Sequence, residues 1–204
     1  MNDLRVQFLF DFGSPNAYLS HKVLPGIEAR TGATFEYVPV LLGGLFKLAN
    51  NRSPAESNAG IPTKQAYEQR QMDRFVQTHG LSKFTHNPHF PVNTLVLMRG
   101  AVAARRLGCF GRYVDAVYAS MWERGKKMDD PQVITAELHQ AGLDPAALLA
   151  ASQEPGVKNA LLQSTQDAFA RGAFGSPIFF VGDEMFFGKD RLREVEEEIV
   201  RARG

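Results

Sequence analysis

The feature that most constrains this chain is the apolar segment Val6-Gln7-Phe8-Leu9-Phe10, which is followed almost at once by a helix start signal. The segment is rich in aromatic residues, and this composition indicates a buried strand. Gly13 permits a tight turn, Ser14 is a good N-cap, and Pro15 suits the first helical position. The unpaired N–H groups and the dipole of a helix N-terminus favour an anion. Ser14 is therefore either a plain helix cap or the group that faces a bound anion.

Two further patterns complete the first unit of structure. The helix is expected to cover residues 15–31, with Gly32 ending it, and a second strand is expected over residues 34–41. A strand, a helix and a strand form a right-handed βαβ unit with parallel strands. Gly43-Gly44 follows this strand, residues 47–62 have the composition of a long exposed loop, and residues 63–79 are expected to be helical.

The middle of the chain is predicted to be helical. Residues 84–94 contain Pro88 and Pro91, which favour a rigid bend, and residues 95–172 show helical periodicity. Asp130-Pro131 and Asp144-Pro145 are cap-then-proline start signals, and a last helix of this block is expected over residues 155–170.

The end of the chain returns to β structure. Residues 178–181 and 184–187 are short apolar runs joined by Gly182-Asp183, which predicts a hairpin. Asp190 is a plausible N-cap for a charged helix over residues 191–203. The order βαβ, helices, ββα is that of an α/β thioredoxin-like fold with an inserted all-helical domain. We expect the thioredoxin-like domain to comprise residues 1–44 and 171–204, and the insertion to comprise residues 45–170.

Composition excludes several kinds of protein. The formal net charge of +1 gives no reason to expect a nucleic acid or a membrane surface as a partner. Cys109 is the single cysteine, so an intramolecular disulfide and a Cys-x-x-Cys pair are both excluded. His86 and His89 lack a nearby cluster of carboxylates or thiols, so we expect no metal site. No leader segment precedes the first strand and no apolar run approaches the ~18 residues of a membrane span, so we expect a cytoplasmic protein.

In thioredoxin-like folds, the reactive group lies at the N-terminus of the first helix and faces a cis-proline before the third strand. Ser14 and Pro177 occupy those places in this chain, and we expect the Ser176–Pro177 bond to be cis. The place of the redox Cys-x-x-Cys motif holds Ser14-Pro15-Asn16-Ala17. Because both sulfurs are missing, dithiol exchange is excluded.

Three stretches resemble the bacterial 2-hydroxychromene-2-carboxylate isomerases. The segment from Phe10 to Leu19 is similar to the Phe-Asp-Phe-x-Ser-Pro-x-x-Tyr-Leu start of that family. Residues 174–177 and 182–192 resemble its C-terminal signature, and Ser57-Asn58 resembles a weaker landmark. The kappa-class glutathione transferases share the fold and the Ser-Pro start.

The resemblance implies a glutathione-dependent isomerase of aromatic catabolism, with 2-hydroxychromene-2-carboxylate or a related small aromatic carboxylate as its substrate. Ser14 would be the catalytic residue that faces the glutathione sulfur. The remaining glutathione contacts would come from Ser176, Pro177, Phe187, Gly188, Lys189 and Asp190. The substrate would meet Lys47, Asn58, Ala59 and Asn93. We also expect a homodimer.

Three other functions remain open from the sequence. A kappa-like transferase would use the same thiolate but consume glutathione, and a non-catalytic peptide-binding module would not bind it. A serine hydrolase is less well supported, because Ser14 lies outside a Gly-x-Ser-x-Gly elbow and no His and acid pair is identifiable by spacing. Gly13 and Asn16-Ala17 replace bulkier residues of the isomerases, so the substrate pocket is expected to differ.

Overall fold

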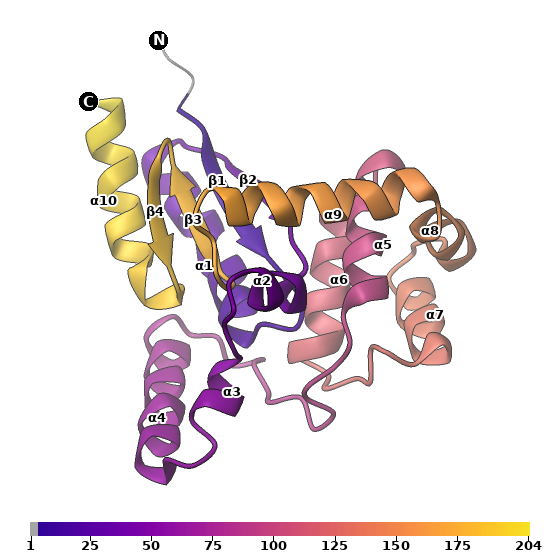
Figure 1. The fold of residues 1–204 in the computed structure, drawn as a ribbon, viewed down its shortest axis with the longest axis horizontal. Helices are drawn as coiled ribbons and strands as arrows, with labels where there is room; N and C mark the ends of the chain where they lie inside the picture. Colours follow the sequence, from indigo (N-terminus) through magenta and orange to yellow (C-terminus); the bar gives the residue numbers. More distant parts are fainter. Residues whose placement is uncertain (1–3) are drawn as a thin grey trace.

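A computed structural model describes residues 4–204, which form one four-stranded sheet surrounded by helices (Figure 1). The strands are β1 (Val6–Phe10), β2 (Phe35–Pro39), β3 (Ile178–Val181) and β4 (Glu184–Phe187). They lie in the order β2-β1-β3-β4. Strand β1 is parallel to β2 and antiparallel to β3, and β3 is antiparallel to β4. The predicted parallel βαβ unit and the predicted hairpin are therefore confirmed.

The helices in the first half of the chain are α1 (Pro15–Thr31), α2 (Leu42–Leu48), α3 (Pro54–Ser57), α4 (Pro62–Thr78) and α5 (Leu95–Arg106). Those in the second half are α6 (Phe110–Trp122), α7 (Pro131–Gln140), α8 (Pro145–Ser152), α9 (Pro155–Ala170) and α10 (Leu192–Arg203). Asp130 and Asp144 cap α7 and α8 through their side chains, as the cap-then-proline signals predict. None of the helices within residues 4–204 is long and apolar enough to cross a membrane.

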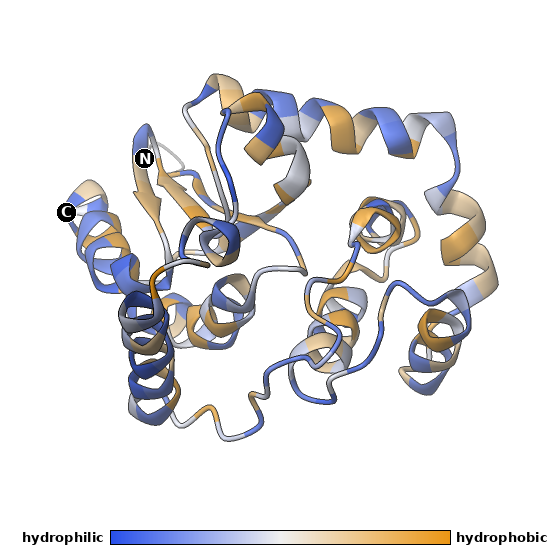
Figure 2. Cartoon of the chain, turned by 60° about the horizontal axis from the view of Figure 1, so that its bottom comes forward, coloured by the Kyte–Doolittle hydropathy of each residue, from blue (hydrophilic) through white to orange (hydrophobic). Residues whose placement is uncertain are grey.

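Both faces of the sheet are covered, which explains why every residue of β1 is buried. On one face, Phe8 and its neighbours pack against apolar residues of α1 and α10, such as Ile27 and Val195. On the other face, Leu9 packs with Leu45 of α2 and Ala168 of α9. Figure 2 shows the strands as hydrophobic and α10 striped with hydrophobic and hydrophilic residues, as expected for a helix with one buried side.

Helices α5 to α8 gather beside the sheet, and α9 leads from them back towards β3 (Figure 1). A large part of the core lies among these helices, where Trp122, Tyr113 and Met121 are fully enclosed. The same apolar cluster continues to Phe10 and Phe12 at the end of β1. The helical block therefore packs directly against the segment that precedes Ser14.

Two local predictions were wrong. No helix was expected at Gly43-Gly44, but this pair lies inside helix α2, where the N–H of Leu42 donates a hydrogen bond to the distant Asp11 carboxylate at 2.8 Å. The segment 47–62 is not a continuous loop either, since it contains the end of α2 and the short helix α3. Helix α3 has a capping box between Ser53 and Glu56, a Ser-x-x-Glu signal that is visible in the sequence.

The predicted capping role of Asp190 was also wrong. A 3-10 turn, η1 (Lys189–Arg191), precedes α10, and the residue at the cap of α10 makes no side-chain capping bond. The Asp190 carboxylate instead accepts a hydrogen bond from the Lys189 ammonium group at 2.6 Å. Lys189 is only 4% exposed, and a buried charge needs a partner. The Asp190 carboxylate pairs with Lys189 and does not cap the helix.

Candidate active site

Ser14 performs two structural tasks at the N-terminus of α1. Its hydroxyl oxygen accepts a hydrogen bond from the N–H of Ala17 at 3.2 Å, which makes it the N-cap of the helix. The same hydroxyl donates to the carbonyl oxygen of Ser176 at 3.1 Å. Ser14 is therefore not a plain helix cap, because its proton points to a second segment of the chain. The N–H of Asn16, in the first turn, has no acceptor among residues 4–204.

The turn before Ser14 is built around the buried carboxylate of Asp11. One carboxylate oxygen accepts from the N–H of Gly13 and the other accepts from the N–H of Leu42, both at 2.8 Å. Burial raises the pKa of Asp11, and hydrogen bonds from the two backbone groups and from Thr94 oppose that rise. Asp11 thus ties the start of α2 to the turn that presents Ser14.

The backbone of Phe12 is held by two side chains of the helical block. The indole Nε1 of Trp122 donates to the Phe12 carbonyl at 2.8 Å. The sulfur of Met98 accepts from the Phe12 N–H at 3.4 Å. These contacts fix both polar groups of a fully buried residue, so they position the turn two residues ahead of Ser14.

The second half of the site is the segment that enters β3. The Ser176–Pro177 bond is cis, as predicted, and Ser176 faces Ser14 through its carbonyl. The Pro177 carbonyl accepts a hydrogen bond from the N–H of Gly188 at 3.0 Å. Gly188 has a φ of 93°, a conformation that favours glycine. The structure therefore brings Ser14, Ser176, Pro177 and Gly188 together by direct contacts.

The residues on either side of Gly188 differ in exposure. The ring of Phe187 is 45% exposed and lies 4.7 Å from the ring of Phe174 between centroids. Lys189 is buried, with its ammonium 5.0 Å from the ring centroid of Phe75 on α4. The side chain of Asp190 is 71% exposed. A polar ligand on this surface would meet one aromatic face and one accessible carboxylate.

The four predicted substrate residues are less closely connected to Ser14. Lys47 is exposed on α2, and Ala59 is exposed after α3. Asn58 is buried, and its carbonyl accepts from the N–H of Ile61 at 3.0 Å. Within residues 4–204, no hydrogen bond or ion pair joins these three residues directly to Ser14.

Asn93 lies nearer to the Ser14 turn through its neighbour in the chain. Its side-chain oxygen accepts from the N–H of Leu95 at the start of α5. The adjacent Thr94 interacts with the Asp11 carboxylate, and a Cβ added to Gly13 would meet the Thr94 methyl at 3.2 Å. Asn93 therefore flanks the turn that carries Ser14.

Asp11, Thr94 and Trp122 support the site and were not predicted from the sequence. Asp11 carried one signal, since it is a charged residue between two phenylalanines at the end of a buried strand. No sequence pattern indicated the roles of Thr94 and Trp122, because their partners are about a hundred residues away in the chain. His86 and His89 belong to no group of three potential metal ligands within residues 4–204.

Comparisons with known proteins identify the family and the fold of this chain. The family model of the DSBA-like thioredoxin domain matches residues 5–200. The chain is 28% identical over 197 residues to the 2-hydroxychromene-2-carboxylate isomerase of Sphingobium xenophagum, covering 96% of this chain and 97% of the relative. It is 25% identical over 209 residues to human glutathione S-transferase kappa 1, covering 92% of this chain and 87% of the relative.

A solved structure of a 2-hydroxychromene-2-carboxylate isomerase superposes with a TM-score of 0.83 at 26% sequence identity. The match covers 97% of this chain and 95% of that structure. The resemblance to these isomerases and the thioredoxin-like fold expected from the sequence are therefore both confirmed.

Proposed function

The chain belongs to the DSBA-like thioredoxin domain family, and from this premise we propose that it is a glutathione-dependent isomerase. Its substrate would be 2-hydroxychromene-2-carboxylate or a related intermediate of aromatic catabolism, and the product would be trans-o-hydroxybenzylidenepyruvate or its counterpart. Relatives that are isomerases or kappa transferases support an enzyme of this general kind. The proposal includes a cytoplasmic homodimer, whose assembly analytical ultracentrifugation would test.

The observation that carries the proposal is the buried Ser14 hydroxyl at the start of α1, where redox members of the fold hold a cysteine. The hydroxyl lies 3.1 Å from a backbone carbonyl of the opposite segment, and Ser14 as a residue is 5% exposed. A serine at this position provides a hydrogen-bond donor and no sulfur of its own. It therefore suits a site where the sulfur arrives with a bound thiol.

The hydrogen bond from Ser14 and the N-terminus of α1 are together strong enough to lower the pKa of a bound thiol. A free thiol has a pKa of ~8.5, and lowering that pKa by about two units requires ~2.7 kcal/mol in favour of the anion. One hydrogen bond to a charged group supplies ~1.5–3 kcal/mol, and a helix N-terminus supplies ~0.3–1 kcal/mol. The Ser14 hydroxyl and the unpaired N–H of Asn16 can together hold the sulfur as an anion without a histidine base.

The residues around Ser14 fit the rest of a tripeptide. The Ser176 carbonyl can accept from a backbone N–H of an extended peptide once Ser14 turns its proton to the sulfur. Lys189 bonds one oxygen of the exposed Asp190 carboxylate, and the other oxygen can accept from the ammonium of the γ-glutamyl end. When bound, glutathione would supply a thiolate that adds reversibly to the unsaturated substrate. Lys47, which is exposed on α2, would attract the substrate carboxylate.

A kappa-like transferase is the second candidate, because human glutathione S-transferase kappa 1 matches nearly the whole chain. The two functions share the thiolate and differ in its fate. An isomerase returns glutathione unchanged, whereas a transferase joins it to the substrate.

One assay separates these functions. The purified protein is incubated with 2-hydroxychromene-2-carboxylate, with and without glutathione, while the product is followed by absorbance and the free thiol is measured at the end. We expect product only when glutathione is present, with the thiol concentration unchanged. Loss of thiol in proportion to substrate would identify a transferase. If there is no turnover and calorimetry shows no binding of millimolar glutathione, the result would favour the non-catalytic peptide-binding module.

A further inference from the structure

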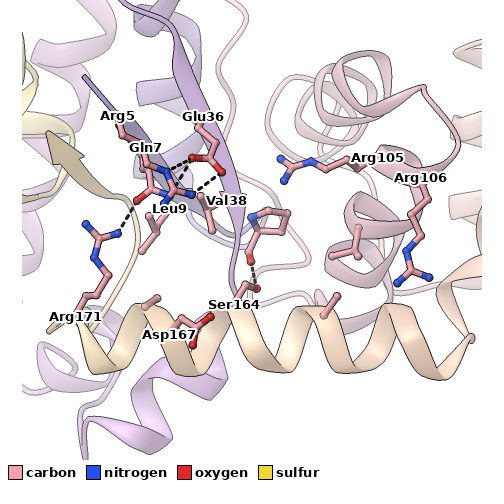
Figure 3. A pocket seen from close by; sticks show the side chains of 14 residues that line it. Arg5, Gln7, Leu9, Glu36, Val38, Arg105, Arg106, Ser164, Asp167 and Arg171 are labelled. Carbon is pink, nitrogen blue, oxygen red and sulfur yellow. Dashed lines mark hydrogen bonds and ion pairs between the residues drawn. The ribbon is translucent and has the colours of Figure 1, made fainter. Parts of the chain in front are cut away.

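A cavity of about 440 Å³ lies on the face of the sheet that α9 covers (Figure 3). Its walls come from β1, β2, α5 and the end of α9. None of the residues predicted to bind glutathione or substrate lines it. The volume falls in the range of small-molecule sites, about 300–1,000 Å³. This cavity is therefore separate from the candidate active site.

The cavity lining has an excess of positive charge. Four arginines line it, namely Arg5, Arg105, Arg106 and Arg171, together with two carboxylates, Glu36 and Asp167. The Glu36 carboxylate is already engaged by Arg5 at 2.7 and 3.1 Å. Arg106 pairs with Glu154 outside the cavity at 3.5 Å. Among residues 4–204, Arg105 and Arg171 have no carboxylate within salt-bridge distance.

Arg171 is held in place by neutral groups. Its guanidinium lies 3.6 Å from the ring centroid of Phe180 on β3. It donates to the side-chain oxygen of Gln7 at 2.5 Å and to the carbonyl of Gly182 at 3.2 Å. A guanidinium has five N–H donors, so these contacts leave others for a ligand.

Arg105 is held in a similar way on the other wall. It donates to the carbonyl of Tyr37 on β2, and its guanidinium lies 4.3 Å from the ring centroid of Phe110. Burial lowers the pKa of Arg105, because part of its charge has been removed from water. The Glu36 carboxylate opposes this shift by its charge, but it is bonded by Arg5 and forms no ion pair with Arg105 among the described residues. A fixed, partly desolvated guanidinium can bind a carboxylate through charge-assisted hydrogen bonds.

The sheet order separates the two arginines. Arg171 contacts β3 and Arg105 contacts β2, while β1 lies between those strands. Adjacent strands are ~4.8 Å apart, so the two anchoring strands are about 10 Å apart. Figure 3 shows the two side chains on opposite sides of the cavity. The floor between them is apolar and consists of Leu9, Val38, Pro39, Val102, Ala160 and Ala168.

We propose that this cavity binds a small organic dianion with a flat apolar body and a carboxylate at each end. One carboxylate is held by Arg105 and the other by Arg171, while the body lies on the apolar floor. The Asp167 carboxylate at the cavity wall opposes this binding. It accepts a hydrogen bond from the Gln163 amide at 2.8 Å and lines the same cavity as Arg171.

Naphthalene-2,6-dicarboxylate is a suitable probe, because two fused rings separate its carboxylates. Isothermal titration calorimetry of the full chain at low salt is expected to show binding, and naphthalene-2-carboxylate is expected to bind more weakly. Arg105→Gln and Arg171→Gln should each weaken binding of the dianion about tenfold or more. Arg193→Gln on the exposed side of α10 is the matched control and should leave the affinity unchanged.

Three results would overturn the proposal. These are no binding of the dianion at millimolar concentration, wild-type affinity in both Arg105→Gln and Arg171→Gln, and loss of binding in Ser14→Ala, which would place the probe in the candidate active site. If Arg105→Gln fails to fold, because the Tyr37 carbonyl loses its donor, Asp167→Asn decides the question. Removing that like charge should strengthen binding about two- to fivefold, and an unchanged affinity would contradict the proposal.

Discussion

The hydroxyl of Ser14 donates a hydrogen bond to the carbonyl oxygen of Ser176 at 3.1 Å, although 162 positions separate the two residues in the chain. This contact joins the start of α1 to the segment that enters β3. A ligand that accepts the hydrogen bond of the Ser14 hydroxyl must give the Ser176 carbonyl another donor. A buried carbonyl without a partner costs about 1–3 kcal/mol. A thiol that belongs to a peptide has both groups, since its backbone N–H lies close to its sulfur.

Trp122→Phe should destabilise the protein and disturb the candidate site together. The substitution removes the donor to the Phe12 carbonyl and leaves that buried oxygen unpaired, at a cost of about 1–3 kcal/mol in the free energy of unfolding. Urea unfolding measures this loss. Met98→Leu is the control on the other side of the Phe12 backbone and should cost less, because sulfur is a weak acceptor. A change below about 0.5 kcal/mol in Trp122→Phe would contradict the assigned role.

Asp11→Asn should change the pH dependence of stability. Burial raises the pKa of Asp11 in the folded state, so the folded protein keeps a proton that the unfolded chain has lost. The contribution of this residue to stability is therefore fully present at pH below the ordinary aspartate pKa, and it falls as pH rises towards the raised value. Asparagine cannot ionise, so the stability difference between wild type and variant should shrink as pH rises.

Glu56→Gln should show the opposite pH dependence of stability to Asp11→Asn. Hydrogen bonds from Ser53 lower the pKa of Glu56, so its contribution to stability is present above the ordinary glutamate pKa and is lost as pH falls. The stability difference for Glu56→Gln should therefore grow with rising pH. Urea unfolding across a pH series measures both variants, and parallel curves for the two would be incompatible with a raised pKa at Asp11.

Asp190→Asn should weaken glutathione binding about tenfold, because it removes the charge that would face the γ-glutamyl ammonium. The pKa of the bound thiol should stay unchanged, since Ser14 and the start of α1 remain intact. Calorimetry gives the affinity, and Asp183→Asn in the neighbouring exposed turn is the matched control. Equal affinities for the two variants would remove Asp190 from the binding surface.

Local chemistry accounts for the part of the fold that could be predicted. The cap-then-proline pairs at Ser14, Asp130 and Asp144 each place a side-chain acceptor against the first turn of its own helix, so a few adjacent residues suffice to locate the start. The Gly182-Asp183 turn likewise needs no distant partner. These signals located the starts of α1, α7 and α8 and the β3–β4 hairpin, whereas α2 and α3 were not predicted.

The features that could not be predicted depend on groups far apart in the chain. Gly43-Gly44 enters a helix whose first N–H, that of Leu42, donates to distant Asp11, and Lys189, which bonds Asp190, is buried against Phe75 of α4. The arginine-lined cavity needs β1, β2, α5 and α9 together. No short window of sequence contains these relationships.

The most direct test of the account is the ionisation of the thiol of bound glutathione in Ser14→Ala. The ultraviolet absorbance of the thiolate is titrated against pH in wild type, in Ser14→Ala and in Ser20→Ala, a buried serine of the same helix whose hydroxyl donates to the Asn16 carbonyl. Loss of one hydrogen bond to an anion should raise the thiol pKa by about one to two units in Ser14→Ala, and Ser20→Ala should titrate as wild type does. An unmoved titration in Ser14→Ala, or a covalent adduct on Ser14 itself, would contradict the role of this hydroxyl as the donor to a glutathione thiolate.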